Sequence, residues 1–513
     1  MLLNKSNISS ITISTLLFIF LVTIPTLSLK SDIWDGTIIE YASKTNNFNG
    51  IYKFFIESHW FLQYPLSVGI IKISNFFSIG YKNMNAIIVS IIFILIIIEL
   101  TIYTKNIFKF SNLEILLMTL FVAVYPVWNV LLSSIMTLHI FCIALGLVSI
   151  RFIHSNSKIK FILGYILLIF SFNLQSLFLF LPCLSYTYDV NANGKNNNFP
   201  SFKTFLIFST GAFFYILFNF IYPPIGLYKN YNSISFFSSI GLKSFILGVI
   251  LYLTFLAPIL TLIIFVCLKK FNITKSIVKN QYNLILSSLN INIISVIFLL
   301  ISSIGSYLFV GKFSYIFDTI DWGGRQAILL FLPLGILNIF AIRFIKEKFI
   351  FSSKTIKALF LIFILTPNFI FLSTGVLFKL NRQKFVYDLE ILLKKNKNTI
   401  PNGGIVQFIC NNAPKPNLRF YETNLMMYNS IGIANYWTSL NKTVDNDFKI
   451  PEYIISDKNH QQEYIFNFNK DYKDIHTIIE LESINYDGLV NVFKNFFYPK
   501  RFKIIKIKSI KYK

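Results

Sequence analysis

Long apolar runs alternate with short polar segments over the first 380 residues of the chain. Many of these runs approach 20 residues, the length that an α-helix needs to cross the hydrocarbon core of a bilayer. The pattern therefore predicts an all-α polytopic membrane protein with about eleven transmembrane helices. We expect them at 8–29, 83–103, 113–129, 131–150, 159–172, 174–187, 201–222, 243–267, 285–310, 326–345 and 357–378.

Two segments do not fit a simple spanning helix. The stretch 159–187 reads as one long helix or two short ones, and Asn173 and Gln175 interrupt it in the middle, which favours a tight hairpin. Polar side chains within a membrane are also costly and mark sites in many proteins. The stretch 61–80 is apolar but carries Lys72 among other polar residues, which favours an interfacial or re-entrant helix.

Charge predicts the orientation of the helices. The first run follows Lys5 and lacks an A-x-A cleavage pattern, so we interpret it as an uncleaved signal anchor with a cytoplasmic N-terminus. The positive-inside rule then places the loop 30–60, the loop 311–325 and the tail 380–513 on the extracytoplasmic side. The basic residues that agree with this topology are Lys105, Lys109, Arg151, Lys158, Lys160, Lys269, Lys270, Lys275, Lys279, Arg343, Lys346, Lys348, Lys354 and Lys357.

The tail is long enough for a domain of its own. Its "GGIVQFI" at 403–409 is typical of a buried strand, and several aromatic segments lie between turn signals. We therefore expect a multi-pass domain at 1–379 and a small extracytoplasmic α/β domain at 380–513.

Composition supports a membrane protein and excludes several other classes. Hydrophobic residues make up 54% of the chain and charged residues only 14%, which leaves too little polar surface for a soluble protein of 513 residues. The net charge of +24 falls largely in short loops, where it orients helices, and no nucleic-acid-binding motif is present. The four cysteines show no C-x-x-C spacing and suggest no disulfide.

The first candidate site is "SDIWDGTIIEY" at 31–41, where the first helix leaves the membrane. Asp32, Asp35 and Glu40 stand close together in a chain that is poor in acids, next to Trp34. A half-dry carboxylate keeps a raised pKa and can act as a base, and a pair of carboxylates can hold a divalent ion. The alternative is that these acids simply face water in an outer loop.

Two more outer segments carry chemistry. In "FFIESHW", Glu57 and His59 precede the interfacial helix, although a lone histidine near a tryptophan is commonly a surface residue. In "DTIDWGGRQ", Arg325 stands at the start of a spanning helix, where a guanidinium and free backbone N–H groups suit a phosphate. The alternative there is an interfacial turn with a snorkelling arginine.

The tail contains a fourth candidate, "RFYETNLMMYNSIGIANYW" at 419–437. Tyr421 and Glu422 precede an aromatic segment, and aromatic faces with acidic and amide partners suit sugar rings. A hydrophobic core accounts for most of these aromatic residues equally well.

Taken together, the signal anchor, "DIWDG…E", the interfacial helix and the late "WGGRQ" loop are similar to the GT-C class of integral-membrane glycosyltransferases, which includes protein mannosyltransferases and aminoarabinose transferases. The resemblance covers about 1–380 and implies an inverting transfer from a polyprenyl-phosphate sugar to a glycan, lipid or protein acceptor. It implies that Asp32 or Asp35 is the catalytic base, with Glu40 as a supporting acid or metal ligand. It also implies that Arg325 meets the lipid phosphate, with Trp34, Glu57, His59, Gln326, Tyr421 and Glu422 as further contacts.

The chain departs from the pattern of that class at Gln326, where a histidine is expected after the arginine. Metal dependence varies across the class, so a divalent metal is neither required nor excluded. The expected location is the bacterial plasma membrane.

Other functional hypotheses stay open. The main alternative is a flippase or transporter of a lipid-linked saccharide, which needs polar residues through the membrane interior; the spans hold few, and no inverted repeat is visible. A polysaccharide polymerase or ligase and a non-catalytic scaffold are further alternatives.

Overall fold

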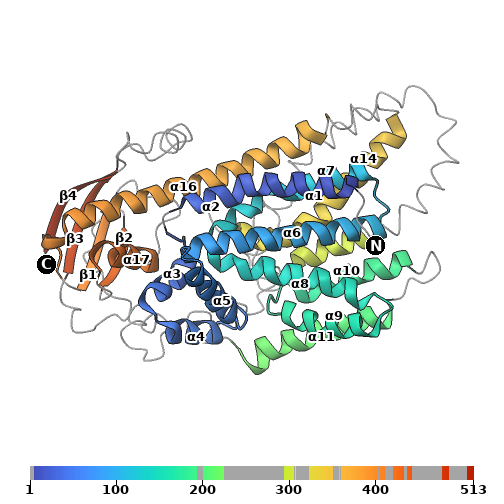
Figure 1. Ribbon diagram of the computed structural model, residues 1–513, viewed down its shortest axis with the longest axis horizontal. Coiled ribbons are helices and arrows are strands. Elements are labelled where there is room, and N and C mark those ends of the chain that lie inside the picture. The colour runs from blue at the N-terminus through green and yellow to red at the C-terminus, as the bar shows by residue number, and fades with distance from the viewer. Residues whose placement is uncertain are drawn as a thin grey trace, which may run out of the picture.

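The structure is a computed structural model that describes residues 5–29, 31–192, 200–223, 294–305, 307, 323–349, 358, 360–401, 404–410, 420–432, 436–441, 476–483 and 505–512. These residues form a predominantly helical body with one small β-sheet at its end (Figure 1).

The helices and strands are distributed along the whole chain. The first part contains α1 (Lys5–Phe18), η1 (Ile19–Thr23), α2 (Ile24–Ser28), α3 (Gly36–Thr45), α4 (Phe48–Glu57), α5 (Gln63–Phe76), α6 (Tyr81–Ile107), α7 (Asn112–Ala123), η2 (Pro126–Leu132), η3 (Ser134–Met136), α8 (Thr137–Ile153), α9 (Lys158–Ser171), α10 (Leu177–Ala192), α11 (Phe202–Ile216) and η5 (Leu217–Ile221). The second part contains η7 (Gly323–Leu330), α14 (Phe331–Phe349), η8 (Leu361–Leu365), α16 (Thr366–Lys395), η9 (Lys397–Thr399), β1 (Gly404–Cys410), α17 (Phe420–Ile431), β2 (Tyr436–Asn441), β3 (His476–Ser483) and β4 (Ile505–Tyr512).

Several helices are long and apolar enough to cross a membrane. They are five, at Lys5–Ser28, Tyr81–Ile107, Ser134–Ile153, Phe202–Ile221 and Gly324–Arg343, or six if α7 and η2 count as one span bent by 48°. Shorter apolar helices occur at Leu177–Val190 and Ile294–Gly305. The described residues thus confirm a helical, membrane-capable body, while the number of about eleven spans stays a prediction. The expected span 243–267 lies outside the described residues.

Two segments whose form the sequence left open are now clear. The stretch 159–187 forms two helices, α9 and α10, joined at 172–176, as the hairpin interpretation predicts. The stretch 61–80 contains α5, a separate helix of 14 residues that follows α4. Large apolar side chains of α9 and α11 face outward, for example Ile159, Phe202 and Phe205, which suits contact with lipid.

The core of the helical body is built from aromatic packing, and a partly buried ion pair joins two of its helices. Phe18 of α1 stacks on Phe93 of α6 with ring centroids 3.7 Å apart, and the Trp128 ring meets both edge-on. Arg151 of α8 pairs with Glu99 of α6 through two hydrogen bonds of 2.7 and 2.8 Å. These paired charges tie α8 to α6.

The segment between α7 and α8 is not a continuous helix and contacts two later elements of the chain. Helix α7 ends at Ala123, and η2 and η3 follow before α8 begins. The Tyr125 hydroxyl donates to the Ala327 carbonyl of η7 at 2.8 Å, and Lys379 of α16 donates to Asn129 of η2 at 2.5 Å. This turn therefore fixes both η7 and α16, the two elements that carry later residues to the candidate site.

The sheet packs against the end of α16. Its strand order is β2-β1-β3-β4, with β1 parallel to β2 and β3, and β4 antiparallel to β3. Strand β1 confirms the strand predicted at 403–409. One face of the sheet packs on α16 and α17 through Phe385, Phe408 and Met427. Helix α16 runs without a break across the expected domain boundary at 379/380, so helical body and sheet are joined by one continuous element.

Candidate functional site

The site is centred on residues 31–35, the connection between α2 and α3. Asp32 is 1% exposed, and its Oδ1 accepts hydrogen bonds from the Ile33 N–H at 2.7 Å and the Ser134 N–H at 3.2 Å. Its Oδ2 is buried and accepts no hydrogen bond from any described residue. Burial raises the pKa of Asp32 to about 7, with a contribution from the negative charge of Glu40, while the hydrogen bonds from Ser134 and Ile33 oppose the rise.

Two residues of α3 shape the space around this carboxylate. Gly36 is its first residue, and a Cβ there would lie only 2.6 Å from Asp32 Cγ and 2.7 Å from Oδ2, so only glycine leaves room for the carboxylate. One turn later, the Glu40 carboxylate accepts from the Asp32 backbone N–H at 2.5 Å and pairs with Lys44 at 2.7 Å. Asp32 and Glu40 are thus brought together, with Glu40 holding the backbone of Asp32.

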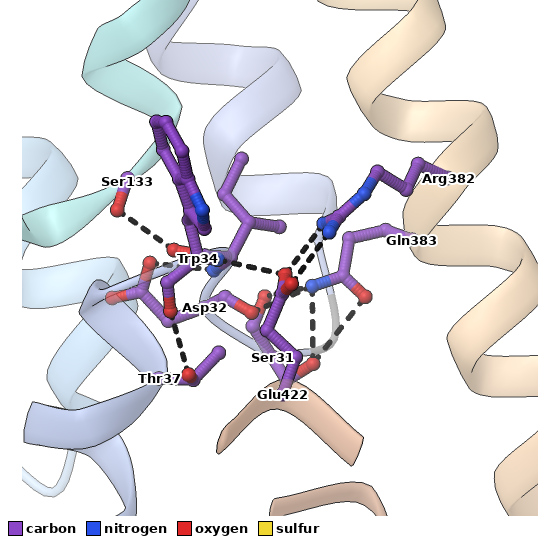
Figure 2. A network of polar contacts seen from close by, with 9 residues as sticks. Ser31, Asp32, Trp34, Thr37, Ser133, Arg382, Gln383 and Glu422 are labelled. Carbon is purple, nitrogen blue, oxygen red and sulfur yellow. Dashed lines mark hydrogen bonds and ion pairs between the residues drawn. The ribbon is translucent and has the colours of Figure 1, made fainter. Parts of the chain in front are cut away.

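Residues from the far end of the chain hold the other side of this loop (Figure 2). The Gln383 amide of α16 donates to the Asp32 carbonyl at 2.7 Å and to the Ser31 carbonyl at 3.0 Å. Glu422 of α17 accepts from the Trp34 N–H at 2.9 Å. Arg382 grips the same carboxylate with two hydrogen bonds of 2.5 Å, and both side chains are 4% exposed.

Trp34 adopts a backbone conformation that most residues avoid. Its φ of 55° lies in the left-handed region, which costs energy for a bulky side chain and persists only where surrounding contacts enforce it. Glu422 provides such a contact at the Trp34 N–H, and Thr37 provides another by donating to the Trp34 carbonyl at 2.6 Å. In this conformation the indole ring of Trp34 lies against Arg325, whose guanidinium carbon is 5.5 Å from the ring centroid.

Arg325 in turn lines a cavity of about 110 Å³ beside the first loop. The cavity is bounded by the α4–α5 turn, the η3–α8 segment, the α9–α10 hairpin, α11 and η7. Its polar and aromatic lining includes Ser58, His59, Trp60, His139, Asn173, Gln175, Tyr215, Tyr307, Arg325 and Gln326. Asp32 does not itself line the cavity, but Ile135, which follows its hydrogen-bond partner Ser134, does.

Two histidines of the cavity are chemically unusual. His59 is 3% exposed and has a φ of 61°, and its ring stacks on those of Phe61 and Tyr222. Burial lowers the pKa of His59, and the nearby backbone of Phe218 opposes this shift. The buried Nδ1 of His139 on α8 has no hydrogen-bond partner in the described part of the chain.

The structure thus gathers most of the residues predicted from the sequence. Asp32, Trp34, Glu40 and Glu422 belong to one hydrogen-bonded network. The cavity contains His59, Arg325 and Gln326, and with them Asn173 and Gln175 of the α9–α10 connection. Asn173 has a structural task as well, because its amide bonds the His59 carbonyl at 3.3 Å and the Leu62 N–H at 3.2 Å.

Three predicted residues lie at the edge of this arrangement. Asp35 is half-buried at the N-cap of α3, and its side chain does not cap the helix. Glu57 is the last residue of α4, and its buried Oε2 makes no hydrogen bond to a described residue. Tyr421 lies in α17 beside Glu422, and its side chain is outside the described residues.

The sequence interpretation missed the residues that hold the loop. Arg382 and Gln383 on α16, Ser134 before α8 and His139 on α8 were not anticipated. A signal existed for α16, because Lys379, Arg382 and Gln383 have the i, i+3, i+4 spacing of one helix face. Their burial and their partners depend on tertiary contacts: Gln383 bonds residues more than 350 positions away, Lys379 bonds Asn129 at 250 positions, and Arg382 bonds Glu422 at 40 positions.

Metal ligands are not evident at this site. Among the residues that the structure describes, no group of three or more His, Cys, Asp or Glu side chains is arranged to hold a metal ion. Comparisons of the chain with protein-family models, with curated proteins and with solved structures found no match.

Proposed function

We propose that the protein is an inverting glycosyltransferase of the bacterial plasma membrane that uses a polyprenyl-phosphate sugar as donor. The acceptor is a surface glycan, a lipid or a protein. The observation that carries the proposal is Asp32: a buried carboxylate with one unbonded oxygen and a pKa near 7, held in the first loop beside a tryptophan that packs on Arg325.

The chemistry assigned to Asp32 is general base catalysis. A base works best when its pKa lies near the working pH, because it is then ionised and still basic enough to take a proton. Oδ1 is occupied by two backbone N–H groups, which leaves Oδ2 as the oxygen able to accept the proton of an acceptor hydroxyl. Asp35 is the alternative base, since it lies three residues away in the same loop.

Arg325 is proposed to stabilise the leaving phosphate. Its guanidinium is always charged, lines the cavity and contacts the Trp34 ring, which gives the cavity a fixed cation for an anionic group. The phosphate of a lipid donor gains charge as the glycosidic bond breaks, and a fixed cation at that position lowers the barrier. Trp34 joins the two parts of the proposed site, because its backbone belongs to the Asp32 network and its ring contacts Arg325.

The proposed orientation puts this end of the helical body outside the cell. The first loop, between α2 and α3, and the sheet lie toward one end of the body, and the N-terminus and the end of α10 lie toward the other (Figure 1). Arg151 is close to the end of α8, which contacts α10 through the hydrogen bond between His154 and Ser185. By the positive-inside rule the end with Arg151 and Lys158 is cytoplasmic, as is the N-terminus. The sheet with α17 is then part of an extracytoplasmic C-terminal unit. A reporter fused to Lys513 tests this, and a cytoplasmic signal from it contradicts the proposed topology.

The test of function is transfer of labelled sugar from a panel of polyprenyl-phosphate sugars to membrane extract by the purified full chain. We expect transfer by the wild type and its loss in Asp32→Asn or Asp35→Asn, with donor binding retained. Asp388→Asn, which removes the charge of Asp388 from a half-buried pair with Lys384 away from the first loop, is the matched control and should keep full activity. Full activity in both site variants rules out the mechanism, and translocation of donor in vesicles without transfer replaces it with a flippase.

A further inference from the structure

The cavity beside Arg325 is also lined by two histidines, whose imidazole nitrogens can form hydrogen bonds. His139 has a buried Nδ1 that makes no hydrogen bond to any described residue, and the imidazole of His59 is almost fully buried in the same lining. Buried polar groups without partners cost free energy, so natural proteins keep few of them. Both imidazoles line the same cavity as Arg325, which indicates a ligand that accepts hydrogen bonds there.

We propose that His139 and His59 complete an anion site with Arg325 and that this site is built for a phosphate monoester dianion, the product left after sugar transfer. The identity of the ligand rests on the proposed glycosyl transfer, whereas the anion site itself does not. The arginine supplies the permanent charge, and the imidazoles supply the additional donors that the second charge of the phosphate demands.

The proposed reaction explains why a second charge appears. The bond between the sugar C1 and the phosphate oxygen breaks, and its electron pair stays on the phosphate. The acceptor oxygen forms the new bond to C1, and its proton moves to Asp32. The phosphodiester monoanion thus becomes a monoester dianion, while the Asp32 carboxylate becomes neutral, so charge and protons balance.

Hydrogen-bond donors discriminate between these two states of the phosphate. The new terminal oxygen of the monoester carries more charge and accepts stronger, charge-assisted hydrogen bonds than the ester oxygen it replaces. Donors placed at this oxygen bind the leaving group more tightly than the donor substrate, which is the pattern that lowers a barrier. The imidazoles are therefore expected to affect binding of the dianion far more than binding of the monoanion.

A matched pair of ligands tests the proposal on the full chain in detergent. Farnesyl phosphate and its methyl ester differ by one charge at a pH well above the second phosphate pKa of about 6. We expect calorimetric titration of the wild type to give a monoester affinity about tenfold or more above that of the methyl ester. His139→Leu should abolish this preference, His139→Gln should restore part of it through its amide, and Arg325→Gln should weaken both ligands.

Controls separate this inference from the proposed function. His154→Gln replaces another histidine, just beyond α8 at the opposite end, where its Nε2 bonds Ser185 at 2.7 Å, and it should keep the preference. Asp32→Asn should also keep it while losing transfer. An unchanged preference in both His139 variants overturns the inference and leaves the transferase standing. Failure of the wild type to bind either ester overturns both the inference and the role of Arg325.

Discussion

Replacing Asp32 by asparagine should stabilise the protein at high pH while it removes transfer. Asparagine has the same shape, and its Oδ1 can still accept from the Ile33 and Ser134 N–H groups. What it removes is a negative charge from a site that is 1% exposed. A substitution that abolishes activity and raises stability identifies a residue kept for function rather than for folding.

The magnitude follows from the pKa of Asp32, which burial raises from 3.8 to about 7. Each pKa unit corresponds to about 1.4 kcal/mol, so ionising this carboxyl in the folded state costs at most about 4 kcal/mol above pH 7. The side-chain NH2 of the asparagine would be buried without a partner, which offsets about 1–3 kcal/mol of the stability gained by removing the charge. The net gain in the free energy of unfolding is therefore on the order of 1–3 kcal/mol above pH 7.

The sign of the pH dependence distinguishes this account from a general packing effect. Between about pH 4 and 7 the folded protein holds a proton that the unfolded chain releases, so the contribution of Asp32 to stability falls as pH rises through that window. Thermal unfolding in detergent, at several pH values across the window, should show this fall in the wild type and a smaller one in Asp32→Asn. Wild-type transfer should rise with pH around a midpoint near 7. Equal pH dependence of unfolding in both proteins refutes the reasoning, and Asp388→Asn serves as the control that should match the wild type.

Two further predictions concern the surroundings of Asp32. Gly36→Ala should displace the carboxylate and lower transfer at least about tenfold, because its Cβ overlaps the side chain of Asp32; Gly69→Ala in α5, where nothing lies within 4 Å, should leave transfer unchanged. Glu422→Gln removes the negative charge that pairs with the buried Arg382 and should lower the free energy of unfolding by about 3 kcal/mol, measured by chemical unfolding. The double variant with Arg382→Gln should regain much of that stability, and a stability equal to that of the single variant contradicts the pairing.

The sequence was sufficient for the local features of the fold. Helix length and apolar content identified membrane-capable segments, because a bilayer demands that each spanning segment satisfy its own backbone. The interruption at Asn173 and Gln175 predicted the hairpin between α9 and α10, and the apolar run at 403–409 predicted β1. Each of these features depends on residues that are close together in the chain.

The assembly of the site was not predictable in the same way. The sequence suggested that Asp32 and Arg325 share one end of the protein, but it gave no reason to join Trp34 to Glu422. That hydrogen bond connects positions 388 residues apart. Nor does any local pattern reveal that His139 and Arg325 line one cavity. Such contacts arise from tertiary packing, and no periodic pattern in a single sequence predicts them.

The contacts around the first loop imply that the C-terminal sheet contributes to the proposed active site. The sheet packs on α17 and on the last turns of α16 through Phe408 and its neighbours. Helix α17 carries Glu422 and α16 carries Gln383, and these side chains hydrogen-bond the backbone of Trp34 and Asp32. Both helices that hold the first loop are therefore packed against the sheet. The left-handed backbone conformation of Trp34 persists only because surrounding contacts enforce it. The position of Asp32 therefore depends on a structure that the chain completes only near its end, and damage to the sheet core should lower transfer without any change in the carboxylate itself.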